Sequence, residues 1–465
     1  MTHRQKMHFE VSERKVLLRL FDLVFVLGTL HLLSVFFKFD YFILSNIRLT
    51  SILALSIYLM VMGTVFEMYN LQVASSQYQV VKSILLTTTS TVVFYLLTPV
   101  LTPTLPNNRT QLIYFYLGVL LGLLIWRLVY QRLFASHRFE KRAVLLCDSS
   151  ECIELVQALE ESNPHYNVVA VFSLDGTRKI DYESKLIKVP KTGPDLVRFV
   201  HANSISEVVV ASNRTTGITS DLYHQILILL EHGYNIREYT QVYESNTYRI
   251  PIQHFDTDFY RYFPFSRSNR NKLYLSSVRL LEVTFSLIGL SFGILLVPFV
   301  FLGNLLISRG PLFYTQTRLG RHGVPFEIIK FRTMRVNAEK HGAVMSTAGD
   351  SRITPMGKIM RKTRIDEFPQ FINILKGEMG FIGPRPERPH FVAELAAVMP
   401  FYETRHVIKP GLTGWAQVNY SYGETLDDSL IKLQYDLYYI KHRSIFLDFN
   451  IVIKTFSTVL FYRGQ

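Results

Sequence analysis

Four long apolar runs in the first third of the chain constrain its fold more than any other feature. They cover residues 16–37, 49–66, 80–101 and 111–130, and each approaches the ~20 residues with which an α-helix crosses a bilayer. The first run is too long, and its end too unlike a cleavage site, to be a secretion signal. We therefore expect residues 1–136 to form a four-helix transmembrane bundle.

Positive charge gathers at the two outer ends of this region, whereas the loops between the runs carry little. The basic side chains concerned are His3, Arg4, Lys6, Arg14 and Lys15, then Arg127, Arg132, Arg138, Lys141 and Arg142. By the positive-inside rule both ends lie in the cytoplasm, which agrees with an even number of crossings. Asp22 and His31 interrupt the first run, and interhelical hydrogen bonding explains them more simply than a polar site within the bundle.

Composition narrows the range of partners. Lys and Arg number 50 against 37 Asp and Glu, a net charge of +13, while 48% of the residues are hydrophobic. A basic excess can serve nucleic acid, anionic lipid or phosphorylated substrates. In so apolar a chain we expect lipid and phosphate, and no nucleic acid. The two cysteines, Cys147 and Cys152, form neither a disulfide framework nor a zinc pattern.

Residues 141–250 alternate short β-rich runs with helical patterns. RAVLLC, NVVAVF and SEVVVAS resemble strands, with helices over 151–159 and 221–232, and this alternation predicts a parallel α/β sheet. The first strand leads into CDSSEC, residues 147–152, without the glycines that allow close approach of a dinucleotide pyrophosphate. We expect a degenerate Rossmann-like domain that serves assembly or regulation and binds no NAD.

Two segments lead toward the second half of the chain. Residues 251–277 mix aromatic and arginine side chains before an apolar run, which favours an interfacial linker over a nucleic-acid surface. The apolar run 278–307 contains Pro298, so it is either a kinked spanning helix or a re-entrant helix that returns to the same face. The basic chain that follows favours the re-entrant helix, with everything after it in the cytoplasm.

The stretch RKTRIDEFPQFINILKGEMGFIGPRP, residues 361–386, places the acidic pair Asp366 and Glu367 among basic residues. An apolar face at i, i+3, i+4 and i+7 (Phe368, Phe371, Ile372 and Leu375) predicts a helix that ends at Gly377. Pro369 is tolerated only near a helix start. The pair therefore lies at or just before the helix N-terminus, where anions are favoured. Taken alone, helix capping explains the two acids at least as well as catalysis does.

Several ordered blocks carry a family resemblance. They are GPLFYTQTRLGRHGVPFEIIKFRTM (310–334), DSRITPMGKIMRKTRIDEFPQFINILKGEMGFIGPRP (350–386), KPGLTGWAQVNY (409–420) and YDLYYIKHRSIFLDF (435–449). Together they resemble the bacterial sugar transferases known as monotopic polyprenyl-phosphate hexose-1-phosphate transferases, or phosphoglycosyl transferases. The long form of that family joins an α-helical membrane bundle, a Rossmann-like α/β domain and a mainly α monotopic catalytic domain with a re-entrant helix. By resemblance, the catalytic domain covers residues 278–465.

The resemblance implies a reaction at the cytoplasmic face of the bacterial inner membrane. A sugar-1-phosphate passes from a UDP-sugar to undecaprenyl phosphate with release of UMP, the step that starts exopolysaccharide, capsule or O-antigen assembly. Asp366 falls on the nucleophile that forms a phosphosugar-aspartate intermediate, and Glu367 on its partner. Both are expected to hold Mg²⁺. The basic residues Lys330, Arg332, Arg361 and Arg385 fall on positions associated with phosphate or nucleotide. Lys330 and Arg332 alternate in a predicted strand and are expected on one side.

Two positions depart from the family pattern, and two other functional classes compete with it. Val278-Arg279-x-x-Glu282 stands where many relatives have Lys-Arg-x-x-Asp, so the acidic charge is kept, and Val297 stands where some have serine. A membrane-anchored nucleotide-sugar epimerase or dehydratase needs the missing glycine-rich turn. A non-catalytic polysaccharide-assembly scaffold does not need Asp366. The sequence does not identify the sugar, and the bundle and additional domain are compatible with a homodimer.

Overall fold

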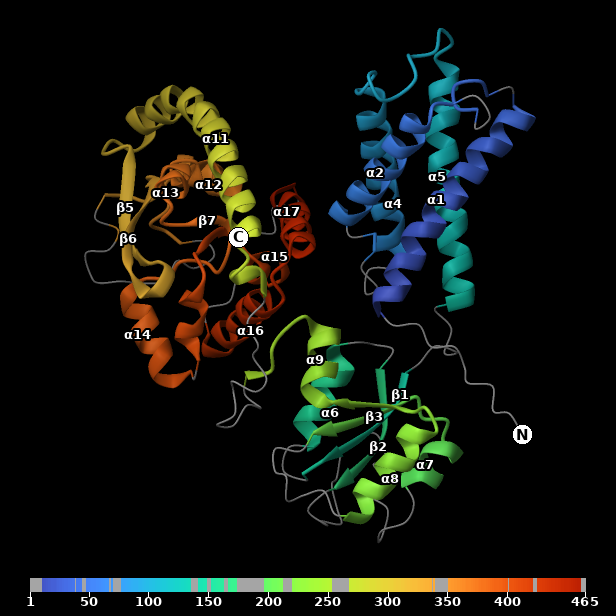
Figure 1. Ribbon diagram of the computed structural model, residues 1–465. Helices are drawn as coiled ribbons and strands as arrows, with labels where there is room; N and C mark the ends of the chain where they lie inside the picture. The colour runs from blue at the N-terminus through green and yellow to red at the C-terminus, as the bar shows by residue number, and fades with distance from the viewer. Residues whose placement is uncertain are drawn as a thin grey trace. The chain divides into compact units, whose positions relative to one another are not determined.

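The computed structural model describes most of the chain as two compact units, residues 1–247 and 248–465, and each is considered by itself (Figure 1). The described residues are 11–37, 39–43, 47–66, 68–69, 77–134, 141–148, 152–162, 166–173, 196–211, 220–252, 267–336, 338, 350–399, 401–420 and 425–460. Residues 253–266 of the expected linker 251–277 fall outside these ranges. At its start Ile252 is buried in the core of the second unit together with Ile250, and its last six residues, 272–277, are helical.

The first unit begins with four apolar helices, as the four runs predict. They are α1 (Val11–Phe36), α2 (Leu49–Val65), α4 (Gln77–Leu96) and α5 (Thr110–Phe134). Within them, Val16–Phe36 and Thr110–Tyr130 are long and apolar enough to cross a membrane, whereas Leu49–Val65 and Val80–Leu96 are apolar but shorter.

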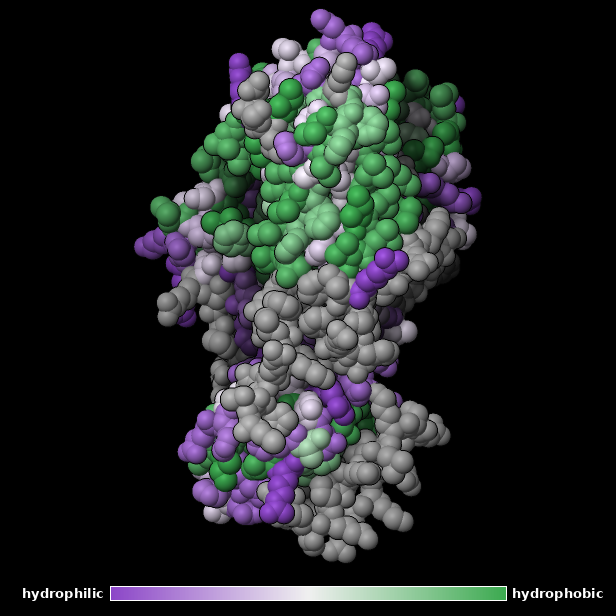
Figure 2. Space-filling view, turned by 90° about the vertical axis from the view of Figure 1, so that its right-hand side faces the viewer, coloured by the Kyte–Doolittle hydropathy of each residue, from purple (hydrophilic) through white to green (hydrophobic). Residues whose placement is uncertain are grey.

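Aromatic rings fill the interior of this bundle, and aliphatic side chains cover its outside. Phe115 of α5 lies 5.0 Å from the Tyr95 ring and 5.8 Å from the Phe42 ring, centre to centre. Leu20, Val24 and many other apolar residues point outward, and Figure 2 shows the hydrophobic surface that results. Such a surface is far larger than water-exposed patches of soluble proteins, so it indicates a membrane-associated protein.

A four-stranded parallel sheet follows the bundle and confirms the predicted α/β pattern. Its strands are β1 (Lys141–Cys147), β2 (Tyr166–Ser173), β3 (Glu207–Ala211) and β4 (Asn235–Glu238), in the order β2-β1-β3-β4. Helices α6 (Cys152–Ser162) and α9 (Tyr239–Thr247) pack on one face, and α7 (Leu196–Ala202) and α8 (Ser220–Glu231) on the other. Residues 149–151 of the glycine-free turn lie outside the described ranges.

The second unit is organised around α11 (Lys272–Ile307), a helix of 36 residues that starts before the expected position 278 and contains Pro298. Figure 1 shows that α11 is bent, so that its two halves run in different directions. Near its start, Tyr274 donates a hydrogen bond to Asp448 of α17, and Tyr439 of α16 donates another to the same carboxylate at 2.6 Å. These contacts tie α11 to the C-terminal helices.

The remaining elements of this unit surround the acidic pair. An antiparallel hairpin, β5 (Phe313–Leu319) and β6 (Pro325–Phe331), precedes α12 (Pro355–Lys362) and α13 (Gln370–Lys376). Two short parallel strands, β7 (Gly380–Ile382) and β8 (Gly411–Thr413), flank α14 (Pro389–Val398). The chain then forms α15 (Trp415–Asn419), α16 (Leu426–His442) and α17 (Ile445–Leu460), whose inner faces bury Trp415, Leu437 and Ile451.

Candidate active site

Asp366 and Glu367 lie in a single 3₁₀ turn, Ile365–Glu367, between α12 and α13. The expectation that they sit just before a helix N-terminus is confirmed, with α13 starting at Gln370 and ending where Gly377 takes φ +82°. The residue that caps α13 is Pro369, and no side chain caps it. Capping of α13 therefore does not explain the two acids. The residue before the turn, Arg364, has φ +59°, a strained conformation of the kind found at functional sites.

The buried face of α13 differs from the predicted one. Gln370, Asn373 and Ile374 are buried, whereas Ile372 of the predicted face is exposed. Phe368 and Phe371 of the predicted face are partly buried, because they pack against core residues and lie over α11. The predicted apolar face is thus buried in part, and the polar residues Gln370 and Asn373 beside it are buried more deeply.

Polar contacts fix α13 on both sides. Asn373 donates to the backbone oxygen of Glu327 at 2.7 Å and accepts from Ile329 N–H at 3.1 Å, which docks the helix on β6. At its other end, Arg279 of α11 donates to the backbone oxygens of Ile374 and Leu375, both at 2.6 Å. These contacts satisfy carbonyls that a helix C-terminus leaves open, and they give the Arg279-x-x-Glu282 motif an anchoring role.

Asp366 is an unusual carboxyl group because it is buried and incompletely bonded. Its exposure is 6%, and its Oδ1 atom has no hydrogen-bond partner among the described residues. Burial, followed by the charge of Glu367, raises the pKa of Asp366, although Lys330, Arg361 and Arg364 oppose the rise. A buried carboxyl oxygen without a partner is costly, so a bound group that contacts Oδ1 would relieve that cost.

Glu367 has the opposite electrostatic balance. Its Oε1 atom lies 3.6 Å from Lys330 Nζ and 3.2 Å from Arg364 Nη1. Burial alone would raise the pKa of Glu367, but the positive charges of Lys330, Arg364 and Arg385 outweigh burial and lower it. Glu367 is therefore the member of the pair that stays ionised, and it gathers the cations around its neighbour.

The four predicted basic residues do not all reach the acidic pair. Lys330 does reach the pair, because its Nζ atom lies 3.6 Å from Glu367 Oε1. Arg361 donates a hydrogen bond to Thr333 Oγ1 at 3.0 Å, and its positive charge lowers the pKa of Asp366. The positive charge of Arg385 lowers the pKa of Glu367.

Arg332 is placed differently. Its side chain donates to Pro311 O at 2.7 Å, to Met334 O at 3.1 Å, and to Asn304 and Ser308 at the end of α11. β6 ends at Phe331, between Lys330 and Arg332. Arg332 joins the end of α11 to the hairpin, and the expectation that it shares one side with Lys330 stays a prediction.

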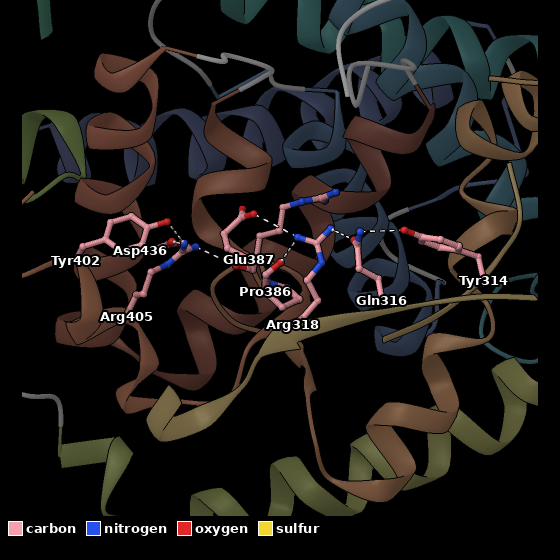
Figure 3. Close-up of polar contacts among 9 residues, drawn as sticks. Tyr314, Gln316, Arg318, Pro386, Glu387, Tyr402, Arg405 and Asp436 are labelled. Atoms are coloured by element: carbon pink, nitrogen blue, oxygen red, sulfur yellow. Dashed lines mark hydrogen bonds and ion pairs between the residues drawn. The ribbon is translucent and has the colours of Figure 1, made fainter. Parts of the chain in front are cut away.

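Two arginines, the half-buried Arg318 and the buried Arg405, hold the loop that carries Arg385 (Figure 3). Arg318 of β5 donates to Pro386 O at 3.1 Å, lies 3.4 Å from Glu387 Oε2, and is held by Gln316 at 2.7 Å. On the other side, Arg405 donates to Arg385 O at 3.0 Å.

Arg405 is itself fixed by Asp436 at 2.8 Å and by the Tyr402 hydroxyl at 2.7 Å. Asp436, a residue of the YDLYYI block, thus has a structural contact with Arg405. The Arg385 backbone is thus positioned by a buried ion pair and needs no contact of its own to the carboxylates to stay in place.

A magnesium ion fits the chemistry of this turn. Among the described residues no group of three or more His, Cys, Asp and Glu side chains is arranged to hold a metal. Mg²⁺, however, commonly takes one or two carboxylates and completes its shell with substrate phosphates and water. The unpartnered Oδ1 of Asp366 and the ionised Glu367 supply that minimum.

Two residues of this site escaped the sequence interpretation. Arg364 was only one of several basic neighbours, and its contact with Glu367 depends on a positive φ that no side-chain pattern reveals. Gln370 is 3% exposed, and its Nε2 atom has no partner in the described part of the chain. Position 370 lies outside the predicted apolar face, so the sequence pattern gave no signal for it.

Comparison with known proteins agrees with this geometry. Residues 273–462 match the bacterial sugar transferase family and residues 64–216 match a CoA-binding domain. A UDP-N-acetylgalactosamine-undecaprenyl-phosphate N-acetylgalactosaminephosphotransferase of Aeromonas hydrophila is 50% identical over 153 residues, 33% of this chain and 36% of that protein. An undecaprenyl-phosphate glucose phosphotransferase of Komagataeibacter xylinus is 38% identical over 259 residues, 54% of this chain and 45% of that protein.

The aligned portion thus spans about a third to a half of the length of these two relatives. A shorter relative, the uncharacterized sugar transferase EpsL of Bacillus subtilis, is 38% identical over 158 residues, 33% of this chain and 72% of that protein. Since most of this relative is covered at such identity, the chain belongs to the bacterial sugar transferases, in the long form that adds a helical bundle and an α/β domain.

Proposed function

We propose that this protein transfers sugar-1-phosphate from a UDP-sugar to undecaprenyl phosphate and releases UMP, the first membrane step of exopolysaccharide, capsule or O-antigen synthesis. The observation that carries the proposal is the pairing of a buried carboxyl that has an unpartnered oxygen, Asp366, with an ionised neighbour that collects cations. The names of relatives that act on undecaprenyl phosphate support the same substrates.

The reaction proceeds in two displacements at one phosphorus atom. A carboxylate oxygen of Asp366 attacks the phosphorus that bears the sugar, a P–O bond forms, and the bond to UMP breaks with its electron pair on UMP. A phosphate oxygen of undecaprenyl phosphate then attacks the same phosphorus, and the Asp366 carboxylate leaves unchanged. Two steps let two very different substrates use one site in turn.

The basic residues perform the electrostatic part of this chemistry. An anionic nucleophile must approach a diphosphate, so positive charge has to offset the repulsion and stabilise charge on the transferring phosphoryl oxygens. The pKa of Asp366 is lowered by the positive charges of Lys330, Arg361 and Arg364, and that of Glu367 by the charge of Arg385. When bound, Mg²⁺ held by Asp366 and Glu367 would supply further charge neutralisation to the phosphates.

The membrane arrangement is part of the proposal. The bend of α11 at its proline-containing segment supports a re-entrant helix rather than a spanning one (Figure 1), because proline removes a backbone hydrogen bond and kinks a helix. α17 presents Phe446, Phe449 and Phe456 outward, with Phe446 88% exposed. Helices with such faces lie in the plane of a membrane interface. The catalytic unit would then lie on the cytoplasmic face, where UDP-sugars are found.

Measurement of UMP release tests the proposal. Purified protein with Mg²⁺, undecaprenyl phosphate and a panel of UDP-sugars should release UMP with at least one sugar. Asp366→Asn should lower the rate at least about a thousandfold, as loss of a nucleophile does. Asp427→Asn, which changes an exposed acid of α16, should leave the rate of UMP release unchanged. Substantial UMP release by Asp366→Asn would defeat the assignment.

Intact-mass measurement separates the two displacements. Incubation with the UDP-sugar alone should add one sugar phosphate to the wild-type chain and none to Asp366→Asn. If the wild-type enzyme turns over but never gains this mass, with acceptor omitted and the reaction quenched rapidly, a direct single displacement replaces the covalent route.

A further inference from the structure

A second group of charged side chains lies inside the helical bundle of the first unit, and the transfer reaction does not use it. Asp22 of α1 accepts from Arg127 of α5, with 2.9 Å between Oδ2 and Nη2, and the two residues are 0% and 3% exposed. This pair confirms the interhelical bonding expected of Asp22, whereas His31 is exposed. Charged residues at membrane depth are costly and commonly mark a functional site.

The cluster is not electrically balanced. Arg19 lies one helical turn before Asp22, with its guanidinium 5.1 Å from the centre of the Tyr69 ring, and Arg127 is 5.7 Å from the same ring. The charged side chains of this cluster that the structure describes, two arginines and one aspartate, sum to a net charge of +1.

Several buried atoms of this cluster have no hydrogen-bond partner in the described part of the chain. They are Arg127 Nε, Arg127 Nη1 and Arg19 Nε. All three are guanidinium N–H donors, whereas the Tyr69 hydroxyl interacts with the Asp22 carboxylate. A buried donor without an acceptor is costly, and donors of this kind bind oxyanions, preferably in a planar, forked arrangement.

The depth of the cluster indicates which anion it meets. Arg19 lies near the start of the apolar segment Val16–Phe36, and Arg127 near the end of Thr110–Tyr130. At 1.5 Å per residue, both are about 5 Å inside the span, close to the boundary between hydrocarbon and headgroups. The same end carries Lys15 and Arg132. Basic sites between helices at this depth are suited to lipid phosphate groups.

We propose that Arg19 and Arg127, which both lie over the Tyr69 ring, form a binding site for the phosphate group of an anionic lipid. Asp22 holds the Arg127 guanidinium in place and limits the local charge to +1, so that one phosphate anion neutralises the cluster. Two lipid classes offer this chemistry, a phospholipid with a phosphodiester and a polyprenyl phosphate with a phosphomonoester. The proposal concerns the bundle and does not depend on Asp366.

Native mass spectrometry of the full-length protein in nanodiscs tests this site. Nanodiscs of phosphatidylcholine alone, with added phosphatidylglycerol, or with added undecaprenyl phosphate distinguish the two lipid sources. Wild-type protein should retain at least one anionic lipid. Arg19→Gln, which leaves the Asp22–Arg127 pair intact, should weaken retention about tenfold or more, because hydrogen bonds to charged groups contribute ~1.5–3 kcal/mol.

The matched control is Arg132→Gln, which removes an exposed basic residue at the same end of α5. It should retain lipid as the wild type does. Equal losses in the two variants, or retention by Arg19→Gln equal to that of the wild type, would overturn the site. UMP release is measured separately from lipid retention. Loss of lipid with normal UMP release supports the lipid site, whereas loss of UMP release with normal lipid retention contradicts only the catalytic proposal.

Discussion

At the scale of single residues, Asp366 and Glu367 show how neighbouring carboxyl groups acquire opposite properties. They share one turn and nearly the same burial, yet the pKa of Asp366 is raised and that of Glu367 is lowered. The difference lies in contact geometry, because Lys330 and Arg364 reach Glu367 directly. One acid is thus stabilised as an anion, whereas the other has an anionic form that is available for attack but poorly stabilised.

Asp366→Asn is expected to stabilise the metal-free protein at neutral pH. A carboxyl whose folded pKa is raised makes folding less favourable once the pH exceeds that pKa, because the unfolded state ionises more readily. The melting temperature of the variant should therefore exceed that of the wild type at neutral pH. The difference should shrink to nothing below the ordinary pKa of aspartate, where both side chains are neutral. A lower melting temperature for the variant at neutral pH would contradict the raised pKa.

Glu367→Gln is expected to have the opposite effect. A lowered folded pKa contributes stability that is present above the unfolded pKa and is lost as the pH falls through the folded pKa. The variant also leaves Lys330 and Arg364 without their carboxylate. We expect a loss on the order of 1–3 kcal/mol at neutral pH, measured by denaturation in detergent, and a smaller loss in acid. Equal stability of the two proteins at neutral pH would argue against the ion pairs.

At the scale of elements, the sequence predicts where helices and strands lie along the chain better than it predicts which residues pack against them. The helix after the acidic pair, its stop at Gly377 and the parallel sheet were all readable, because turn chemistry and strand composition are local. The partners of these elements were not readable, because they come from distant parts of the chain. Phe371 of α13 lies over Gly289 of α11, and Arg332 bonds to Ser308 at the end of the same helix.

Close packing of α11 against α13 gives an element-scale prediction. A Cβ at Gly289 would lie 2.7 Å from Cδ2 and 2.8 Å from Cζ of the Phe371 ring, whereas one at Gly293, a turn later, meets Phe368 at an ordinary 3.5 Å. Gly289→Ala should therefore displace the helix that follows Asp366. We expect a cost of about 1–3 kcal/mol from overpacking, partly offset by the ~1 kcal/mol helix preference of alanine over glycine.

Gly293→Ala is the matched control for this change. It gains the same helix preference without the clash, so its melting temperature should equal or exceed that of the wild type. UMP release should fall in Gly289→Ala and persist in Gly293→Ala. If the two variants behave alike, the contact between α11 and Phe371 does not position the acidic turn.

At the scale of the whole molecule, exposed apolar surface recurs in both units. In the second unit it covers α11, where Leu280, Phe292 and Leu306 are among many outward side chains, and it continues on α17. Water-exposed surfaces of this extent are unstable, so the bilayer is part of the solvent in which both units fold.

In the proposed arrangement, the course of α11 decides on which side of the membrane the acidic pair lies, and Pro298 is the residue that we expect to control this course. Proline leaves the Ile294 carbonyl without its helical donor and costs a regular helix ~3 kcal/mol. A straight helix of 36 residues would be about 54 Å long, ample for a ~30 Å hydrocarbon core. Pro298→Leu should therefore favour the spanning form and carry the rest of the chain across.

Reporter fusions at the C-terminus measure this change. A fluorescent protein that matures only in the cytoplasm should fluoresce on the wild-type chain and lose signal on Pro298→Leu, while an alkaline phosphatase fusion should gain activity. Val297→Leu, a neighbouring change that keeps the proline, should resemble the wild type in both fusions. UMP release should fall with the share of chains that cross, because the UDP-sugar is cytoplasmic. If fluorescence is unchanged in Pro298→Leu, the basic chain after α11, rather than the proline, holds the catalytic unit on its side.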